Sequence, residues 1–374
     1  MTALYVVATL GVGLAVACQV LLNSTLSAHF GLGIFSTAVS FGSGLAYLTA
    51  ACALEARAAG LPFLRWRERP RPALLLPGAL GVAFVTCGNV LSPLAGYSLF
   101  WVCVVVGQLA MSAALDATGF SLAGRRIPVS AAKAALLALA AGGAAMAVAG
   151  GLGTAAGVSP GLLVACAAGS AAAGAVMPLQ AALNRHAALL LPSRLAATWW
   201  SFFFGTLLSL AVLAISLGTA PAVAARFPVA FASSEFVWYL GGAIGVVYVA
   251  STIFVTGHIG SSLYFVSLIC GQLAGSAALD ALGAFGTPAI LAGPLRVAGI
   301  VLVLAAAATM QLQPAQAQWL SARCCLSCFA PRAAAETAGG AKEAAGGAAS
   351  SGAFLALACA PGRYPSFHPP ALCR

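Results

Sequence analysis

The sequence predicts an all-α membrane protein with many spanning helices, and three observations support this fold class. Some 61% of the residues are apolar and only 6% are charged, whereas about 25% charged residues are typical of a soluble domain. The apolar stretches are about 20 residues long, the length that a helix needs to cross roughly 30 Å of hydrocarbon. They lack the alternating polarity of barrel strands, which span a membrane in about 10 residues.

Ten such stretches follow one another, and each is expected to form one spanning helix. Those of the first half cover approximately residues 3–22, 33–54, 74–91, 98–115 and 131–149. Those of the second half cover approximately residues 162–183, 195–217, 237–256, 261–279 and 295–312. The first stretch is hydrophobic like a signal peptide, but it lacks a basic start and carries polar residues that recur in the second half. We therefore interpret it as a retained helix.

The two halves of the chain repeat one another. Residues 107–119 and 271–283 share the pattern GQLAxSAALDAxG, 164 residues apart. Earlier in each half, a second set of residues recurs with a displacement of 161: Gln19, Asn23, Ser40, Phe41 and Gly44 match Gln180, Asn184, Ser201, Phe202 and Gly205. A duplicated hydrophobic unit that keeps its polar residues in register is typical of secondary transporters built from two repeats.

The positive charges predict how the chain is oriented. If the N-terminus is cytoplasmic, 15 of the 17 Lys and Arg residues fall in cytoplasmic loops or in the C-terminal tail, and only Arg226 and Arg296 fall outside. Cytoplasmic loops of membrane proteins are enriched in these residues. Both termini are then cytoplasmic, and the net charge of +10 needs no nucleic-acid partner. Because each repeat has five helices, the second repeat must lie inverted relative to the first.

The expected organisation is a first five-helix repeat at residues 1–150, a second at 161–312, and a C-terminal tail at 313–374. The tail is rich in Ala, Gly and Pro and has little amphipathic periodicity. Such a composition favours disorder. We expect the tail to be cytoplasmic.

The motifs resemble those of a known family. Each half contains QxxxN followed by SFxxG, at 19–23 and 40–44 and again at 180–184 and 201–205. Together with GGAIGVVYV at 241–249 and the duplicated GQLxxSxxLDxxG, they resemble the YdcZ-like members of the drug/metabolite transporter superfamily. The resemblance covers about residues 1–312 and implies two five-helix halves that export small molecules across an inner membrane. The first half departs from the pattern at residues 78–81, which have only one glycine of the leading pair.

Two polar stripes are candidates for a substrate pathway. Each contains Gln, Ser and Asp at positions i, i+4 and i+8, and so lies on one face of its helix: Gln108, Ser112 and Asp116, and Gln272, Ser276 and Asp280. The two Asp residues would lie near opposite mouths of a central cavity, with the glutamines about 12 Å deeper. Alternatively, each Asp is hydrated or paired and begins a turn closed by Gly119 or Gly283.

Three further groups of residues have expected roles in the substrate pathway or in helix packing. Amides one helical turn apart offer donors and acceptors to a ligand or, alternatively, to a neighbouring helix: Gln19 with Asn23, and Gln180 with Asn184. Aromatic side chains such as Phe202 and Tyr248 are candidates for a pocket, whereas Trp199 and Trp200 are expected to anchor a helix at the membrane interface. Small residues permit close helix packing: Gly44, Gly205, Gly241, Gly242 and Gly245.

The sequence shows no enzyme motif. It contains no Walker loop, HExxH or nucleophile elbow, and its four His have no ligand spacing, so we expect no catalysis, metal or cofactor. The favoured function is a secondary carrier, in the plasma (inner) membrane, that exports small organic metabolites or drugs by alternating access. The alternatives are an ion or small-solute channel and a non-transporting membrane scaffold. The expected partners are a small-molecule substrate and the lipid bilayer, with a homodimer left open.

Overall fold

The fold is taken from a computed structural model, which describes residues 2–60, 72–120, 129–151, 159–284, 289 and 291–309. These residues form helices and connecting turns, without strands. In chain order the elements are α1 (Thr2–Phe30), α2 (Gly33–Ala59), η1 (Pro72–Leu75), α3 (Leu76–Ala95), α4 (Tyr97–Thr118), α5 (Ala131–Gly151), α6 (Pro160–Leu190), α7 (Arg194–Thr219), α8 (Pro221–Ala224), α9 (Phe227–Ser233), η2 (Phe236–Leu240), α10 (Gly241–Phe254), α11 (Thr256–Leu282) and a last helix (Pro294–Thr309).

The all-α membrane fold is confirmed. Within the described ranges, nine helices are long and apolar enough to cross a membrane, and the last helix is shorter but also apolar. Each of the ten predicted stretches coincides with a helix, although the end of the tenth, beyond residue 309, lies outside the described residues. The predicted tail at 313–374 also lies outside them.

Helix α1 extends eight residues beyond the predicted end of its stretch, to Phe30. The extension is polar, which is why hydropathy alone ended it early, but its side chains have partners. Ser24 shares a hydrogen bond of 2.7 Å with the Tyr97 hydroxyl, and Ser27 shares one with Ser36. Polar side chains paired between helices can remain inside a bundle, because their hydrogen-bonding capacity is satisfied.

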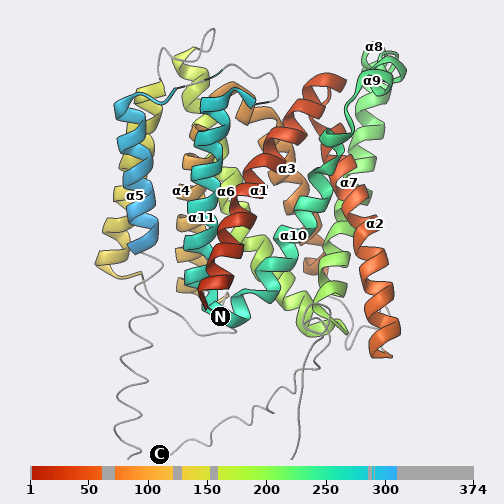
Figure 1. The fold of residues 1–374 in the computed structure, drawn as a ribbon, viewed down its shortest axis with the longest axis horizontal. Coiled ribbons are helices and arrows are strands. Elements are labelled where there is room, and N and C mark those ends of the chain that lie inside the picture. The colour runs from red at the N-terminus through yellow and green to blue at the C-terminus, as the bar shows by residue number, and fades with distance from the viewer. Residues whose placement is uncertain are drawn as a thin grey trace, which may run out of the picture.

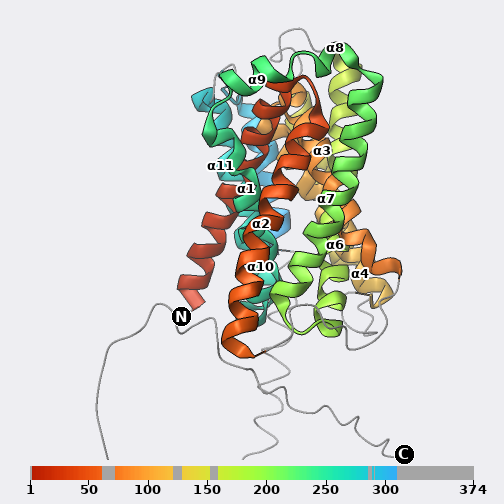
Figure 2. The ribbon, with the colours of Figure 1, turned by 90° about the vertical axis from the view of Figure 1, so that its right-hand side faces the viewer.

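The short elements α8 and α9 were not predicted, whereas η2 falls at the start of the predicted stretch 237–256. Both α8 and α9 have a proline in the first turn, where the missing N–H disrupts no helical hydrogen bond. They lie at the end of the bundle opposite the N-terminus, and α9 crosses the ends of α1 and α2 (Figures 1 and 2). His29 of α1 contacts α9 through Nε2, 3.0 Å from the Ala230 carbonyl oxygen.

The helices of the two halves interleave. The most extensive packing joins α1 to α11, α4 to α6, α2 to α7, and α3 to α6, so each of these pairs takes one helix from each half. Figure 1 shows α5 beside the last helix at one edge of the bundle. There Gly143 lies against Gly299. The halves therefore form one bundle rather than two separate domains.

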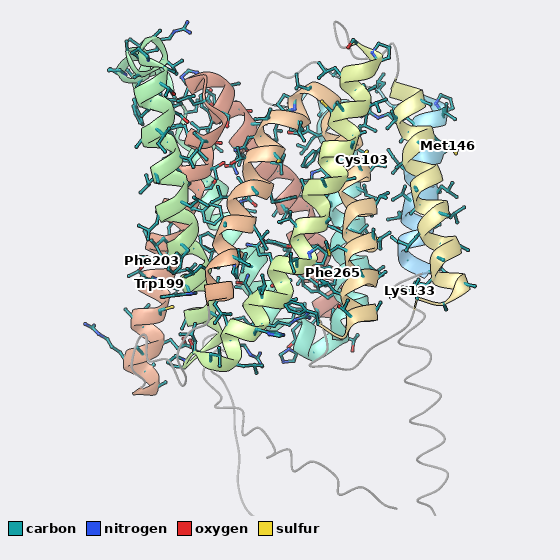
Figure 3. All side chains as sticks on the ribbon, turned by 180° about the vertical axis from the view of Figure 1, so that it is seen from behind. Cys103, Lys133, Met146, Trp199, Phe203 and Phe265 are labelled. Carbon is teal, nitrogen blue, oxygen red and sulfur yellow. The ribbon has the colours of Figure 1, made fainter. Side chains whose placement is uncertain are left out.

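Aromatic residues lie on the outer surface of α7. The rings of Trp199 and Phe203 stack with centroids 5.0 Å apart, and Figure 3 shows both at the periphery. The Trp199 indole also donates to Thr49 Oγ1 on α2 at 2.8 Å. These side chains thus belong to the outer face of the α2–α7 pair.

Candidate functional site

A cavity lies in the middle of the bundle, among α1, α2, α3, α6, α7 and α10. It encloses about 480 Å³ of space free of protein atoms, part of which is open to solvent. Both halves of the chain contribute to its walls, which are formed by Val16, Gln19, Ser40, Phe41, Gly81, Phe84, Val85, Gln180, Phe202, Gly245, Tyr248 and Val249.

The lining residues are arranged symmetrically. Ten of the twelve form five pairs at the displacements of the sequence repeat: Gln19 with Gln180, Phe41 with Phe202, Gly81 with Gly245, Phe84 with Tyr248, and Val85 with Val249. The first two pairs are 161 residues apart and the other three 164. Each wall of the cavity in one half therefore has its counterpart in the other.

The amides of Gln19 and Gln180 lie over glycines of the opposite half. A Cβ at Gly81 would lie 2.7 Å from Gln180 Nε2, and a Cβ at Gly245 would lie 2.9 Å from Gln19 Nε2. Gln180 Nε2 donates to the Pro77 carbonyl oxygen at 3.0 Å. Gln19 forms no hydrogen bond with the described residues, so its donor and acceptor remain available. The glycines give these two amides the space to reach the cavity.

Apolar side chains and rings make up most of the remaining wall. The rings of Phe41 and Phe202 lie 5.2 Å apart between centroids. Each packs on a glycine of the other half, since Phe202 covers Gly44 and Phe41 covers Gly205. Among the described lining residues there is no Asp, Glu, Lys, Arg or His. The cavity thus combines aromatic surface with a few neutral polar groups.

The second predicted amide of each half lies beside the cavity, and here the halves differ. Ser40 Oγ donates to Asn23 Oδ1 at 2.8 Å, and Gly241 packs against this pair. In the second half, Asn184 Oδ1 and Ser201 Oγ are both buried without a hydrogen-bond partner among the described residues. Asn23 therefore joins α1 to α2 through this hydrogen bond, whereas Asn184 Oδ1 forms no equivalent bond with Ser201.

The predicted polar stripes do not line the cavity. Gln108 Nε2 donates to Met177 Sδ at 2.8 Å, and Gln272 is buried with neither amide atom paired inside the described part of the chain. The residue equivalent to Met177 in the first half is Val16, which offers no acceptor. Ser276 donates to the Leu273 carbonyl of its own helix.

The remaining members of the first stripe are less well placed. Ser112 is half-buried on α4. The side chain of Asp116 lies outside the described part of the structure. The surroundings of the acidic side chain are therefore described for Asp280 and not for Asp116.

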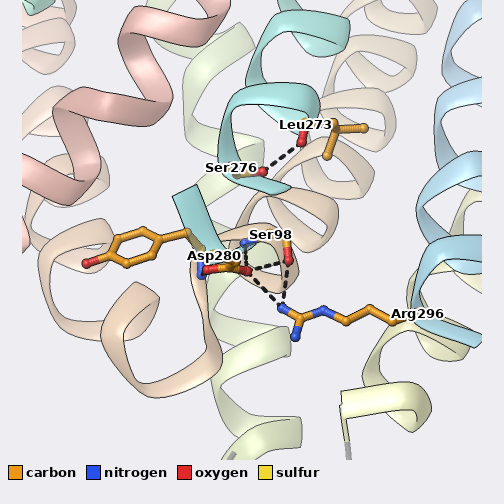
Figure 4. A network of polar contacts seen from close by, with 6 residues as sticks. Ser98, Leu273, Ser276, Asp280 and Arg296 are labelled. Atoms are coloured by element: carbon orange, nitrogen blue, oxygen red, sulfur yellow. Dashed lines mark hydrogen bonds and ion pairs between the residues drawn. The ribbon is translucent and has the colours of Figure 1, made fainter. Parts of the chain in front are cut away.

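Asp280 is buried and bonded at the end of the bundle that carries α8 and α9 (Figure 4). Its carboxylate accepts from the backbone N–H groups of Tyr97 and Ser98, at 2.9 and 2.8 Å, and from the Ser98 hydroxyl. Arg296 lies 3.2 Å away and also donates to Ser98 Oγ. Since the two backbone donors begin α4, the carboxylate caps that helix, where a negative charge is favourable.

This network corresponds to the paired alternative for Asp280 that the sequence left open. It joins the end of α11, the start of α4 and the start of the last helix. Arg296, which charge counting placed on the outer side at the start of the tenth predicted stretch, lies in the first turn of the last helix and is only 3% exposed. Gly283, with φ of 56°, ends α11 just after the network, and Gly119, with φ of 76°, ends α4 equivalently.

The predicted glycines lie where helices approach closely. A Cβ at Gly242 would meet the backbone of Ser40 and Gly44, and the equivalent Gly78 faces Ser201 and Gly205 in the same way. Two further close contacts, not singled out from the sequence, are also equivalent in the two halves. Gly13 of α1 lies against Gly271 of α11. The equivalent residues Gly174 and Gly107 lie against α4 and α6, respectively.

Some cavity residues were not foreseen. Phe84 and Val85 belong to no motif, and Phe84 differs from its counterpart Tyr248. The signal that would have found them is the displacement of 164 residues applied to similar rather than identical side chains. The Asp280–Arg296 pair had no such signal, because the two residues belong to one half and their pairing depends on how the last helix packs.

Comparison with known proteins gives one match. The model of the family described as "Putative inner membrane exporter, YdcZ" matches residues 4–146 and 165–309. These segments fall on the two halves of the chain. No curated protein and no solved structure matches at a significant level.

Proposed function

Because this chain belongs to the YdcZ family of inner-membrane exporters, and is thus an integral membrane transporter, we propose that it is a secondary carrier working by alternating access. Its two halves would lie inverted in the membrane, with both termini in the cytoplasm. The solute would bind in the central cavity and leave toward the outside.

The symmetry of the cavity is the observation that supports this mechanism. An inverted pair of halves can exchange conformations, so that the walls that open to the cytoplasm in one state are replaced by their counterparts opening outward in the other. A cavity lined by equivalent residues from both halves is what such an exchange requires. Close helix contacts through small residues, such as Gly44 and Gly205, are suited to rigid movement of packed helices.

The proposal is tested with single thiols at a mirror pair, Val85→Cys and Val249→Cys, in a protein whose native cysteines are replaced by alanine. Reconstituted protein is treated with a membrane-impermeant thiol reagent from one side at a time. Alternating access predicts that each position reacts from both sides, without any ion conductance. Leu210→Cys, on the outer surface of α7, is the matched control and should react from neither.

The alternatives give different results. A channel would show reaction from both sides together with ion conductance. A membrane scaffold would leave both cavity positions unreactive from at least one side. Either result would contradict the carrier mechanism, and neither requires the substrate to be known.

A further inference from the structure

Among the described residues that line the central cavity, the Tyr248 phenol is the one ionisable group. A charged solute entering it would lose its hydration without gaining a counter-ion. Burying an unpaired ion costs several kcal/mol even after relaxation of the surroundings. The buried charges of Asp280 and Arg296 do not compensate for this, because they already bind one another at the end of the bundle. The cavity therefore selects against ions.

Rings surround the space from both halves. Phe41 and Phe84 belong to the first half, and their counterparts Phe202 and Tyr248 to the second. The aliphatic side chains of Val85 and Val249 complete this surface. Aromatic walls favour aromatic ligands, since ring pairs contribute about 0.5–1.5 kcal/mol beyond the area that they bury.

The available hydrogen-bonding groups are neutral amides. Gln19 has both its donor and its acceptor free of described partners, while Gln180 has its Nε2 occupied by Pro77 and keeps its Oε1 as an acceptor. A side-chain amide pairs best with a group that both donates and accepts. A solute amide can accept from Gln19 Nε2 and donate to Gln19 Oε1. The N–H of such an amide can also donate to Gln180 Oε1.

We propose that the cavity binds an uncharged solute that carries an aromatic ring and an amide-like polar group. This inference rests on the proposed carrier function, because it assigns the substrate class of the same site. It follows from three features of the walls together: the lack of ionised side chains, the four rings, and the two glutamines. A ring would lie among the aromatic residues with its polar group toward Gln19 and Gln180.

The test compares benzamide, benzoate and benzamidinium, which share a ring and a planar head group and differ in charge. Binding to the purified full-length protein is measured by ligand-detected NMR with titration. We expect benzamide to bind saturably and the two ions to bind at least tenfold more weakly. Comparable or tighter binding of either ion would overturn the neutral class. Failure of all three to bind saturably would overturn the aromatic amide class.

Two variants place the binding in the cavity. Gln19→Leu and Gln180→Leu should each weaken benzamide at least fivefold. Ser209→Ala, which removes a buried hydroxyl of α7 that bonds only within its helix, is the control and should leave affinity unchanged. Full affinity in both glutamine variants would remove the proposed binding mode. The thiol-labelling experiment does not depend on these binding results. The proposed substrate class can therefore be wrong while the carrier mechanism is correct.

Discussion

The two halves of the molecule agree around the cavity and diverge away from it. Five pairs of equivalent residues face one another across the central space, including both glutamines and four rings. One helical turn from Gln19, the halves already differ: Asn23 and Ser40 are bonded to each other, but Asn184 and Ser201 are not. Around the cavity the two halves contribute equivalent side chains, although of the two glutamines Gln180 bonds to Pro77 and Gln19 has no hydrogen bond among the described residues.

Away from that shared environment, each half meets different surroundings. Gln108 finds the sulfur of Met177, whereas Gln272 faces the part of the bundle where Val16 replaces that methionine. The Asp280–Arg296 pair closes one end of the bundle. Equivalent polar residues away from the cavity therefore have different partners in the two halves.

The largest expected effect comes from the peripheral ion pair. Asp280→Ala should lower the free energy of unfolding by about 3–5 kcal/mol, because it leaves the buried Arg296 guanidinium without its counter-charge. Thermal or denaturant unfolding in detergent measures the change. The double variant Asp280→Ala/Arg296→Met should lose less than the single one, since no unpaired charge remains. A double variant as unstable as the sum of its parts would contradict the pairing.

The difference between the halves is sharpest at the equivalent serines. Ser40→Ala should cost about 1–3 kcal/mol by leaving the buried Asn23 Oδ1 without its donor. Ser201→Ala should be neutral or slightly stabilising, because the hydroxyl it removes has no partner in the described residues. Unfolding measurements on both variants decide the point, and equal losses would show that the two halves are bonded alike.

The glycine contacts should behave alike in both halves. Gly107→Ala and Gly271→Ala each place a Cβ against the backbone of a neighbouring helix. The overpacking exceeds the roughly 1 kcal/mol that alanine adds in helix propensity, so we expect net losses of about 1–2 kcal/mol. Gly142→Ala meets nothing within 4 Å and should instead stabilise. A large difference between the first two would break the symmetry of packing.

The smallest effect on stability is expected at Gln272. Gln272→Leu removes a buried amide with two unpaired atoms, and should raise the free energy of unfolding by about 1 kcal/mol. The polar-stripe hypothesis predicts that this variant and Gln108→Leu insert normally but lose solute flux, although neither glutamine lines the central cavity. Stability is measured by unfolding, and flux by counterflow in liposomes. Full flux in both variants would exclude these glutamines from the pathway.

The sequence predicted most of the fold because its determinants are local. Apolar length located the helices, and identical residues at fixed displacements identified the repeat, including Gln19, Gln180, Phe41 and Phe202 of the cavity wall. The duplicated aspartates were identified but not their surroundings. Asp280 caps a helix more than 180 residues earlier in the chain, a contact that no local pattern encodes.

Two kinds of error have clear physical causes. Hydropathy ended α1 too early, because Ser24 and Ser27 are polar yet paired inside the bundle. Charge counting placed Arg296 on the outer side of the membrane but missed its burial, because its partner Asp280 belongs to another helix. Both errors arise where tertiary hydrogen bonds compensate for a polar residue, which a single sequence does not show.

The inverted arrangement of the halves is tested most directly at Arg57 and Gly218, which are 161 residues apart and lie near the ends of α2 and α7. Both positions are exposed, and Gly218 has space for a side chain. Labelling of Arg57→Cys and Gly218→Cys with an impermeant reagent on intact cells should show the first protected and the second reactive. Labelling of both from the same side of the membrane would contradict the inverted repeat and, with it, the carrier mechanism.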